Sequence, residues 1–377
     1  MDNLSINIVS FDIPYPANYG GVIDVFYRIK ALSELGVKIH LHCFYSDRKE
    51  SAELHKYCVT VTYYKRSKSI FAALKKLPFI VASRRNAALE NNLRFNDYPI
   101  LFEGLHTTWL LGQDAFPDRN KLVRMHNVEH HYYKSLAAAE SGFLKGMFFR
   151  SEARKLKRYQ KVLNKADVIF AISDTDYTYF KERFENVERL PPFHPFPQSA
   201  YAETALPYAF YHGNLTVPEN CDAVKFLVNE VFAPLEMELV VAGKGADAFG
   251  KKAFAENEKV RFVGGVSDEE MLKLAKSASL HVLPTFQSTG FKLKLIYSML
   301  TARHVLVNSK MIAGTGAEPY CYTAETAEEF QSQIFKLFNK KLDRSEFENR
   351  LQFVERAFSN RNSALAITLF LKQLPRK

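Results

Sequence analysis

Short apolar segments alternate with stretches of helical periodicity along the whole chain, and a cluster of prolines divides this alternation into two halves. The apolar segments have the length of strands, and the stretches between them repeat apolar residues at helical spacing. This order predicts parallel sheets with helices on both faces. The strands predicted in the first half span 6–11, 37–44, 100–102, 121–125 and 168–172.

The proline cluster separates two potential domains. Prolines 191, 192, 195 and 197 suit neither a sheet nor a helix interior, so they predict a linker. A chain of 377 residues is long enough for two cores. We therefore expect an α/β protein of two Rossmann-like domains, 1–195 and 196–360, that face each other across a cleft. The final helix, within 361–377, is expected to pack back across the hinge.

Composition narrows the class of protein. Hydrophobic residues make up 47% and charged residues 24%, which is typical of a globular chain. No apolar run has the length of a membrane span, and the first residues do not resemble a signal peptide. The four cysteines, Cys43, Cys58, Cys221 and Cys321, show no metal-binding spacing. We expect a cytoplasmic protein with reduced thiols.

The net charge of +10 lies mostly in the first half, where residues 1–199 contain 29 Lys and Arg against 21 Asp and Glu. Two segments, 65–85 and 142–158, mix these charges with Phe and Leu. They suit either an interfacial helix on anionic lipid or an ordinary helix with a basic outer face. An anionic membrane surface is therefore a candidate partner of the first half of the chain. No nucleic-acid-binding motif accompanies the charge.

The segment 283–299 carries the strongest chemical signal. A predicted strand ends there, and a predicted helix opens at Gly290. A helix N-terminus with a glycine is a favourable place for an anion. At 100° per residue Gly290, Lys294 and Tyr297 share one helical face, and Lys292 does not. Lys294 is therefore predicted as the first contact of a bound phosphate, with Lys292 second.

Two further glycine turns follow predicted strands in the second half. One contains Gly213 and Asn214, and the other contains Gly243 and Lys244. All three turns are expected at the carboxyl edge of one sheet, where ligands of open α/β sheets bind.

Polar residues also follow strands in the first half. His126 comes after a predicted strand, and Asn127 is expected to cap the helix that spans 129–164. His106 and Asp12 follow other strands, and histidine can move protons near neutral pH. His130 and His131 are expected on a helix surface. A zinc site of His126 and His130 lacks a third ligand, so no metal is expected.

The order of these motifs resembles a known group. Gly213-Asn-Leu, Val240-Val-Ala-Gly-Lys-Gly, the segment 260–285 and Gly290-Phe291 occur in the order found in the donor-binding half of GT-B glycosyltransferases. The likeness is to the retaining group called family 4 or group 1. The loop from Pro16 to Gly21 resembles the double-glycine loop of that group, which faces the acceptor.

The resemblance implies a nucleoside-diphosphate sugar donor in the second half and an acceptor in the first. It also implies retention of anomeric configuration, no cofactor and no required metal. The residues expected to act in catalysis are His126, Lys294 and Lys292. Those expected at the donor are Gly213, Asn214, Gly243, Lys244, Val266, Thr289, Gly290, Phe291 and Tyr297. Those expected at the acceptor are Asp12, Gly20, Gly21, His106 and Asn127.

The chain departs from the group at two positions that usually hold glutamates. Thr289 and Tyr297 occupy them, and Asn214 stands where an arginine is common. Lys244, Lys292 and Lys294 are expected to supply the missing charge. The resulting hypothesis is a hexosyltransferase of polysaccharide or glycoconjugate assembly, acting on a glycan or lipid-linked acceptor. The alternatives are a nucleotide-sugar epimerase of the same fold and a non-catalytic, membrane-associated relative.

Overall fold

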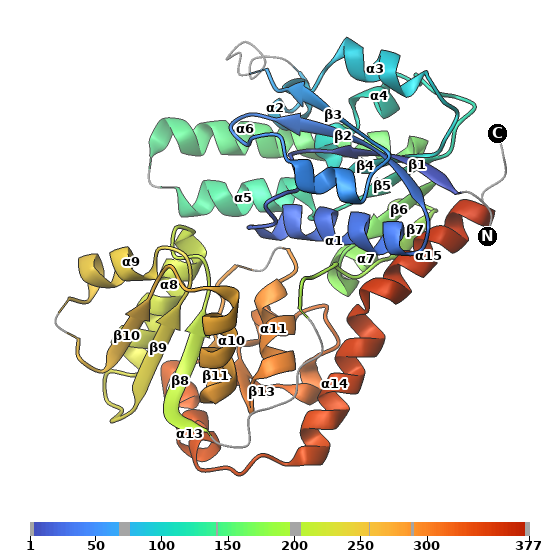
Figure 1. The fold of residues 1–377 in the computed structure, drawn as a ribbon. Helices are drawn as coiled ribbons and strands as arrows, with labels where there is room; N and C mark the ends of the chain where they lie inside the picture. Colours follow the sequence, from blue (N-terminus) through green and yellow to red (C-terminus); the bar gives the residue numbers. More distant parts are fainter. Residues whose placement is uncertain are drawn as a thin grey trace. The chain divides into compact units, whose positions relative to one another are not determined.

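The computed structural model describes residues 4–67, 76–140, 142–196, 205–255, 257–287 and 290–373. The chain forms two compact units. The first contains residues 1–195, 289–291 and 358–377, and the second contains 196–288 and 292–357. Each unit is built around one parallel sheet, as the alternation of apolar and helical segments predicts (Figure 1).

The sheet of the first unit has seven strands in the order β3-β2-β1-β4-β5-β6-β7, and all pairs are parallel. Its central strands are almost completely buried, because helices cover both faces. The strands are β1 (Ser5–Ser10), β2 (Lys38–Tyr45), β3 (Thr60–Lys65), β4 (Ile100–Glu103), β5 (Lys121–Arg124), β6 (Val168–Ala171) and β7 (Val187–Arg189).

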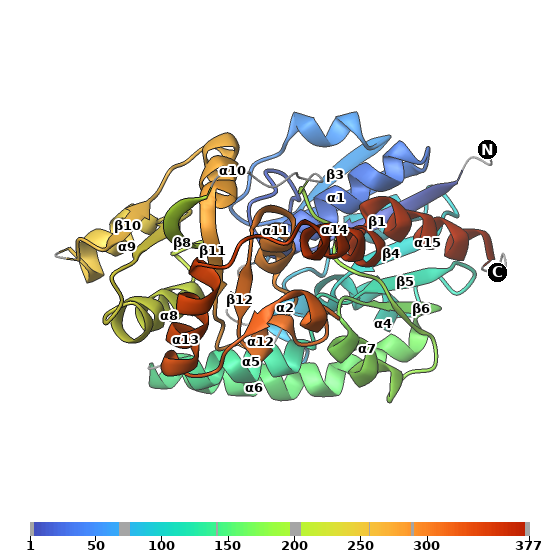
Figure 2. The ribbon, with the colours of Figure 1, turned by 90° about the horizontal axis from the view of Figure 1, so that it is seen from below.

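The helices of this unit include a hairpin of α5 and α6, which lie side by side (Figure 2). They replace the single helix expected over 129–164, because Gly142 is extended and starts a new helix. The helices are α1 (Gly20–Glu34), α2 (Phe79–Ala82), α3 (Ala87–Leu93), α4 (Trp109–Gly112), α5 (Glu129–Ala139), α6 (Phe143–Tyr159), α7 (Asp174–Lys181) and α15 (Asn360–Gln373).

The sheet of the second unit has six parallel strands in the order β10-β9-β8-β11-β12-β13. The order places β8 in the middle, so its carboxyl end is flanked by the ends of β9 and β11. The strands are β8 (Leu206–His212), β9 (Glu238–Ala242), β10 (Val260–Val263), β11 (Ala278–Leu283), β12 (Val305–Val307) and β13 (Tyr322–Thr323).

The helices of the second unit follow its strands in turn. The helix expected over 222–231 begins earlier, at Pro218, and continues as a π-helical turn over Leu227–Val231. The helices are α8 (Pro218–Phe226), α9 (Ala246–Ala253), α10 (Asp268–Ser277), α11 (Leu293–Thr301), α12 (Ser309–Ile312), α13 (Ala327–Phe338) and α14 (Arg344–Phe358).

The last helix, α15, belongs to the first unit and packs against α1. Its residues Ala364, Ile367 and Leu371 share one helical face and join the core formed by α1 and the sheet. The chain thus leaves the first unit near Pro195 and returns to it for its final helix. Among the described residues, no helix has the length and apolar character needed to cross a membrane.

Candidate functional site

The carboxyl edge of the second sheet is shaped by two touching glycine turns. Gly243, after β9, has φ of +137°, and a β-carbon there would overlap the carbonyl oxygen of Gly213 after β8. The turns are also joined by a hydrogen bond from Leu215 N to Lys244 O of 2.8 Å. Because only glycine permits this approach, main-chain groups of both turns form one exposed edge.

The start of α11 differs from the expectation. Gly290 has φ of +74°, which is outside helical geometry, and α11 begins at Leu293 with Lys292 as its N-cap. The prediction that the helix opens at Gly290 is therefore wrong, and Gly290 shares no helical face with Lys294 and Tyr297. Gly290 groups with the first unit, where a β-carbon on it would lie 2.6 Å from Asn127 Oδ1. Thr289 lies outside the described residues.

Lys294 extends from α11 to the turn after β8. Its Nζ donates to Tyr211 Oη at 3.0 Å and to Asn220 Oδ1 at 2.5 Å. The same Nζ lies 3.3 Å from the position of a β-carbon on Gly213. Burial, with a further contribution from Lys292, lowers the pKa of Lys294 to about 8, although Glu219 opposes this. The ammonium group is thus buried, and its direct hydrogen-bond partners are neutral.

Lys292 takes part in a neighbouring ion pair. Its Nζ lies 3.2 Å from Glu219 Oε1, in the first turn of α8. The same carboxylate oxygen accepts a hydrogen bond of 2.6 Å from Thr285, the second residue after β11. The structure therefore brings both predicted lysines to the carboxyl edge of the sheet. Lys292 has a carboxylate partner there, whereas the bonds of Lys294 are to neutral oxygens.

Two buried histidines fix α11 against the sheet. The hydroxyl of Ser298 in α11 lies 2.7 Å from His281 Nδ1 and 3.0 Å from His212 Nε2. His281 belongs to β11 and His212 ends β8. At its other end α11 is held by Arg350, which donates to the carbonyl oxygens of Met299 and Ala302. These contacts position the helix that carries Lys294.

The other residues predicted at the donor have varied surroundings. Asn214 Oδ1 accepts from the backbone N of Thr216 at 3.0 Å, which shapes the turn after β8. Lys244 is exposed and Val266 is half-buried after β10. Tyr297 packs against His212, with ring centroids 4.9 Å apart, and its buried hydroxyl has no partner among the described residues. Phe291 packs against Phe358 in the first unit.

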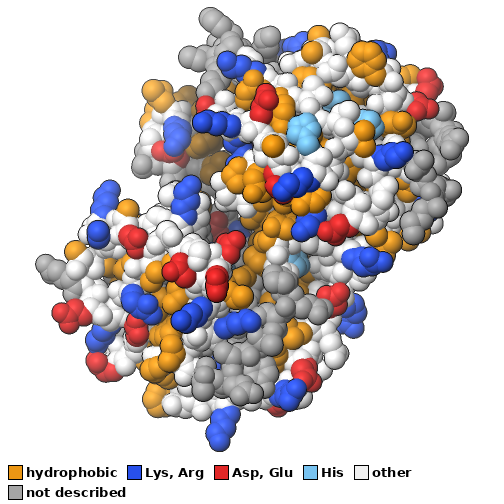
Figure 3. Space-filling view, viewed as in Figure 1, with side chains coloured by type: hydrophobic (Ala, Val, Ile, Leu, Met, Phe, Trp, Pro, Cys, Tyr) orange, Lys and Arg blue, Asp and Glu red, His pale blue; other side chains and the backbone are white. Residues whose placement is uncertain are grey.

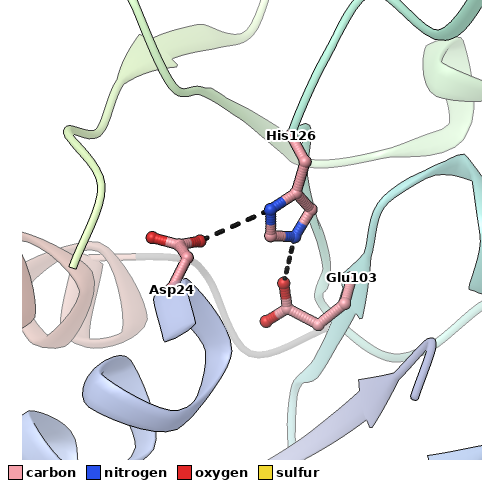
Figure 4. A group of neighbouring side chains, drawn as sticks. All are labelled: Asp24, Glu103 and His126. Carbon is pink, nitrogen blue, oxygen red and sulfur yellow. Dashed lines mark hydrogen bonds and ion pairs between the residues drawn. The ribbon is translucent and has the colours of Figure 1, made fainter. Parts of the chain in front are cut away.

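In the first unit, His126 lies between two buried carboxylates (Figure 4). Its Nε2 is 3.0 Å from Glu103 Oε2, and its Nδ1 is 3.6 Å from Asp24 Oδ2. Glu103 ends β4 and Asp24 lies in α1, so the sheet edge and a helix hold the ring together. The sequence analysis did not single out Glu103 or Asp24, because neither stands in a motif.

Two buried arginines complete this cluster. Arg28 Nη2 lies 2.7 Å from Glu103 and 3.2 Å from Asp24, and Arg124 Nε lies 3.2 Å from Asp24. Burial alone would raise the pKa of Asp24, but Arg124 and Arg28 outweigh it and hold the pKa well below its usual value. The two carboxylates are balanced by two guanidinium groups.

Asp24, Glu103 and His126 bring their ligand atoms within 4.8 Å of one another, which is close enough for a metal ion. A divalent ion would add two charges to a buried cluster whose carboxylates the arginines already neutralise. It would also compete with Arg28 and Arg124 for the same oxygen atoms. The donor set therefore does not fit a metal site.

His106 and Glu129 form a second polar pair in this unit. Their atoms Nδ1 and Oε1 are 4.0 Å apart and buried, and neither has a hydrogen-bond partner among the described residues. Burial, and to a lesser extent Asp176, raises the pKa of Glu129 to about 8. Burial also lowers the pKa of His106. Both groups are therefore neutral near pH 7, and a hydroxyl group could bridge them.

The helix after His126 differs from two expectations. Val128 is the N-cap of α5 and Asn127 makes no capping bond, because the side chain of Asn127 interacts with Glu129. His130 is buried, whereas His131 is exposed as predicted. The sequence analysis overlooked Glu129, although an acidic residue in the first turn after a strand end was a usable signal.

Phe11 links the residues predicted at the acceptor. Its ring lies 5.3 Å from that of His106 and 5.2 Å from that of His126. A β-carbon on Gly21 would lie 2.8 Å from the Phe11 ring, so glycine permits the first turn of α1, which begins at Gly20, to pack against this ring. Asp12 directly follows Phe11 in the sequence. Its carboxylate accepts hydrogen bonds from Ile13 N at 2.9 Å and from the hydroxyl of Tyr19 at 2.8 Å. These residues therefore gather at one edge of the sheet.

No protein-family model matches the chain. One curated relative is an uncharacterised 44.6 kDa protein in the cps region of Klebsiella pneumoniae. It is 28% identical over 330 residues, which covers 82% of this chain and 84% of the relative.

Two solved structures resemble nearly the whole chain. TarM of S. aureus superimposes with a TM-score of 0.70 at 12% identity over 98% of this chain and 99% of TarM. HepE of Anabaena, solved with UDP and glucose, superimposes with a TM-score of 0.64 at 14% identity over 99% of this chain and 100% of HepE. Both are GT-B glycosyltransferases. This chain therefore has the GT-B fold, and the predicted pair of Rossmann-like domains is confirmed.

Proposed function

We propose that the chain is a glycosyltransferase that moves a hexose from a nucleoside-diphosphate sugar to a glycan or lipid-linked acceptor with retention of configuration. The observation that carries this proposal is the buried ammonium group of Lys294 beside the Gly213 turn. A buried cation whose direct partners are neutral is costly unless a ligand brings negative charge. The diphosphate of a nucleotide sugar would supply that charge at the carboxyl edge of the sheet.

The reaction needs positive charge where the diphosphate leaves. The bond between the anomeric carbon and the diphosphate oxygen breaks, and its electron pair stays with that oxygen. Lys294 and Lys292 would stabilise the developing charge, and the main chain of the Gly213 and Gly243 turns would let the phosphates approach closely. Thr289 and Tyr297, which replace the usual glutamates, would contact the sugar and the ribose.

The first unit would present the acceptor hydroxyl. A new bond forms from that oxygen to the anomeric carbon, and the hydroxyl proton passes to the diphosphate oxygen that has left. His126, His106 and Asn127, with Asp12 and the loop at Gly20 and Gly21, would bind and orient the acceptor. The complex of HepE with UDP and glucose supports a UDP-hexose as a candidate donor. The cps-region relative supports polysaccharide assembly as the setting.

The decisive experiment is a screen of UDP-, GDP-, dTDP- and ADP-sugars by thermal shift, followed by calorimetry on any ligand that stabilises the chain. Lys294→Ala should weaken binding by at least about tenfold, because it removes a buried charged contact. Lys273→Ala, at an exposed position of α10, is the matched control and should bind normally. If no nucleotide sugar binds the wild-type chain, the proposal fails and the non-catalytic alternative gains support.

Incubation of the donor with the protein, without any acceptor, distinguishes a transferase from an epimerase. A transferase should leave the sugar configuration of the donor unchanged, whereas an epimerase should convert the donor without any acceptor. Nuclear magnetic resonance of the incubated donor distinguishes the two outcomes.

A further inference from the structure

Two arginines of the first unit lie at the carboxyl edge of its sheet. Arg66 directly follows β3, and Arg84 follows α2 by two residues. Arg84 Nε donates to the carbonyl oxygen of Phe11, the residue directly after β1, at 3.0 Å. Arg66 Nη2 lies 3.4 Å from the hydroxyl of Ser83, the neighbour of Arg84. Both guanidinium groups are therefore at the edge where open α/β sheets bind ligands.

Neither arginine has a negatively charged partner. Arg84 is 4% exposed, and its printed bonds are to the carbonyl oxygens of Phe11 and Ile80. Nε of Arg66 is buried without a partner among the described residues. No carboxylate of the described chain lies within ion-pair distance of either guanidinium. Burial, with a further contribution from Arg66, lowers the pKa of Arg84 to about 9.

The other buried arginines of the described chain either form ion pairs or, like Arg119 and Arg350, donate through three nitrogens to neutral oxygens. Arg28 and Arg124 form ion pairs with Asp24 and Glu103. Arg119 donates through three of its nitrogens to neighbouring backbone and amide oxygens.

Arg84 donates hydrogen bonds through two of its nitrogens, Nε and Nη1. No described residue accepts a hydrogen bond from its Nη2. Asp12 attracts both Arg66 and Arg84 electrostatically, but its oxygens accept from Ile13 N and the Tyr19 hydroxyl. Two neighbouring cations are thus partly or fully desolvated with no carboxylate in direct contact among the described residues, which is unfavourable unless an anion binds.

We propose that Arg66 and Arg84 bind a compact anionic group, a phosphate or a carboxylate, on the sugar acceptor. This inference rests on the proposed glycosyltransferase function and adds the chemical class of the acceptor. A guanidinium group presents parallel N–H donors that match both phosphate and carboxylate oxygens. The positive excess of residues 1–199, with 29 basic against 21 acidic residues, would also attract such an acceptor.

The test uses the full chain and three small probes: glycerol 3-phosphate, glucuronate and uncharged glycerol. At least one of the two anions should bind in calorimetry, and glycerol should not. Arg66→Gln should weaken that binding by about tenfold or more, because a charged hydrogen-bond donor is lost. Lys65→Gln removes the same charge from the adjacent, exposed residue and should change binding less than twofold.

Arg84→Lys gives a second readout if its melting temperature shows that it folds. It keeps the charge but loses the parallel donors, so anion binding should still fall. Comparison of the two anions decides whether the acceptor group is a phosphate or a carboxylate. The inference is overturned if neither anion binds the wild-type chain, or if Arg66→Gln binds as the wild type does.

Titration with UDP separates this inference from the proposed function. Arg66→Gln should bind UDP normally, because the donor is assigned to the second unit. If Arg66→Gln lost UDP binding and anion binding to the same extent, the anion would belong to the donor and not to the acceptor. That result would overturn the inference. If anions bind through Arg66 but no nucleotide sugar binds at all, the anion site stands and the glycosyltransferase proposal fails.

Discussion

A β-carbon on Gly243 would overlap the carbonyl oxygen of Gly213, so the turns after β9 and β8 touch through their main chains. The φ of Gly243, +137°, is also a value that other residues rarely adopt. The choice of glycine at position 243 is therefore dictated by backbone geometry. The contact brings two strand ends together at the place assigned to the donor.

Gly243→Ala should destabilise the chain by more than about 2 kcal/mol, because a methyl group would collide with backbone and the new residue would be strained. Chemical denaturation measures the change. Gly146→Ala is the control, since a β-carbon there, in the first turn of α6, meets nothing within 4 Å. That control should be neutral or slightly stabilising. Equal stability of both variants would contradict the turn geometry described here.

The pKa of Lys294, about 8, predicts how donor binding depends on pH. The protonated amine attracts the diphosphate and the neutral amine does not, so affinity should fall as the pH rises above 8, where the second ionisation of the UDP phosphate is already complete. Calorimetry with UDP across this range measures the effect. Lys294→Met should bind more weakly and lose this pH dependence, and a variant that kept it would remove Lys294 from the site.

Glu129 predicts a pH-dependent stability. Its pKa is raised to about 8 in the folded chain, above the value near 4.5 of a free glutamate, so the folded state binds one more proton between these limits. Stability should therefore fall as the pH rises from about 5 to 8. Glu129→Gln removes the ionisation, so it should become more stable relative to the wild type as the pH rises. A constant difference from pH 5 to pH 8 would show that Glu129 titrates normally.

Asp24→Asn should be severely destabilising, by about 3–5 kcal/mol, because it leaves Arg28 and Arg124 with one buried carboxylate between them. Urea unfolding followed by circular dichroism measures the loss. Asp114→Asn breaks only an exposed pair with Lys165 and should cost less than about 1 kcal/mol. Similar losses in the two variants would mean that the buried cluster contributes no more than a surface pair.

The first turn of α6 provides a test of membrane association. Phe143, Leu144 and Met147 are 74%, 80% and 50% exposed, and Lys145 lies among them. Basic and acidic side chains are interspersed over the face seen in Figure 3, so charge alone marks no single patch there. Part of the other basic segment, residues 68–75, lies outside the described residues.

We propose that the exposed turn of α6 touches anionic lipid. The wild-type chain should co-sediment with phosphatidylglycerol vesicles, and Phe143→Ser with Leu144→Ser should reduce the bound fraction severalfold. Phe335→Ser, which removes a similarly exposed aromatic ring from α13, should have no effect. Equal binding of all three chains would place any lipid contact elsewhere.

Local periodicity predicts strands over 238–242 and 260–263 and a helix from about 268 to 277, and β9, β10 and α10 have these bounds. Ser173 and Ser267 stand before helical segments, where serine favours an N-cap, and both cap helices. The strands that escaped prediction, β3, β7 and β13, lie at the ends of their sheets. Edge strands are short or partly exposed, so their apolar pattern is weak.

The candidate site was less predictable, because it depends on distant contacts. The backbone of Gly290 and the burial of Glu129 follow from packing that no local pattern records. Arg66 and Arg84 appeared in the sequence only as members of a basic segment. Their lack of carboxylate contacts among the described residues became visible once the fold brought the ends of β1 and β3 and helix α2 to the same edge of the sheet.

The return of α15 to the first unit has a consequence for biosynthesis. Ala364, Ile367 and Leu371 emerge from the ribosome only after the entire second unit has been made, yet they complete the core around α1. The first unit must therefore wait, with one apolar face uncovered, until the second unit has been translated. Cutting the gene at the prolines would leave that half permanently without its closing helix.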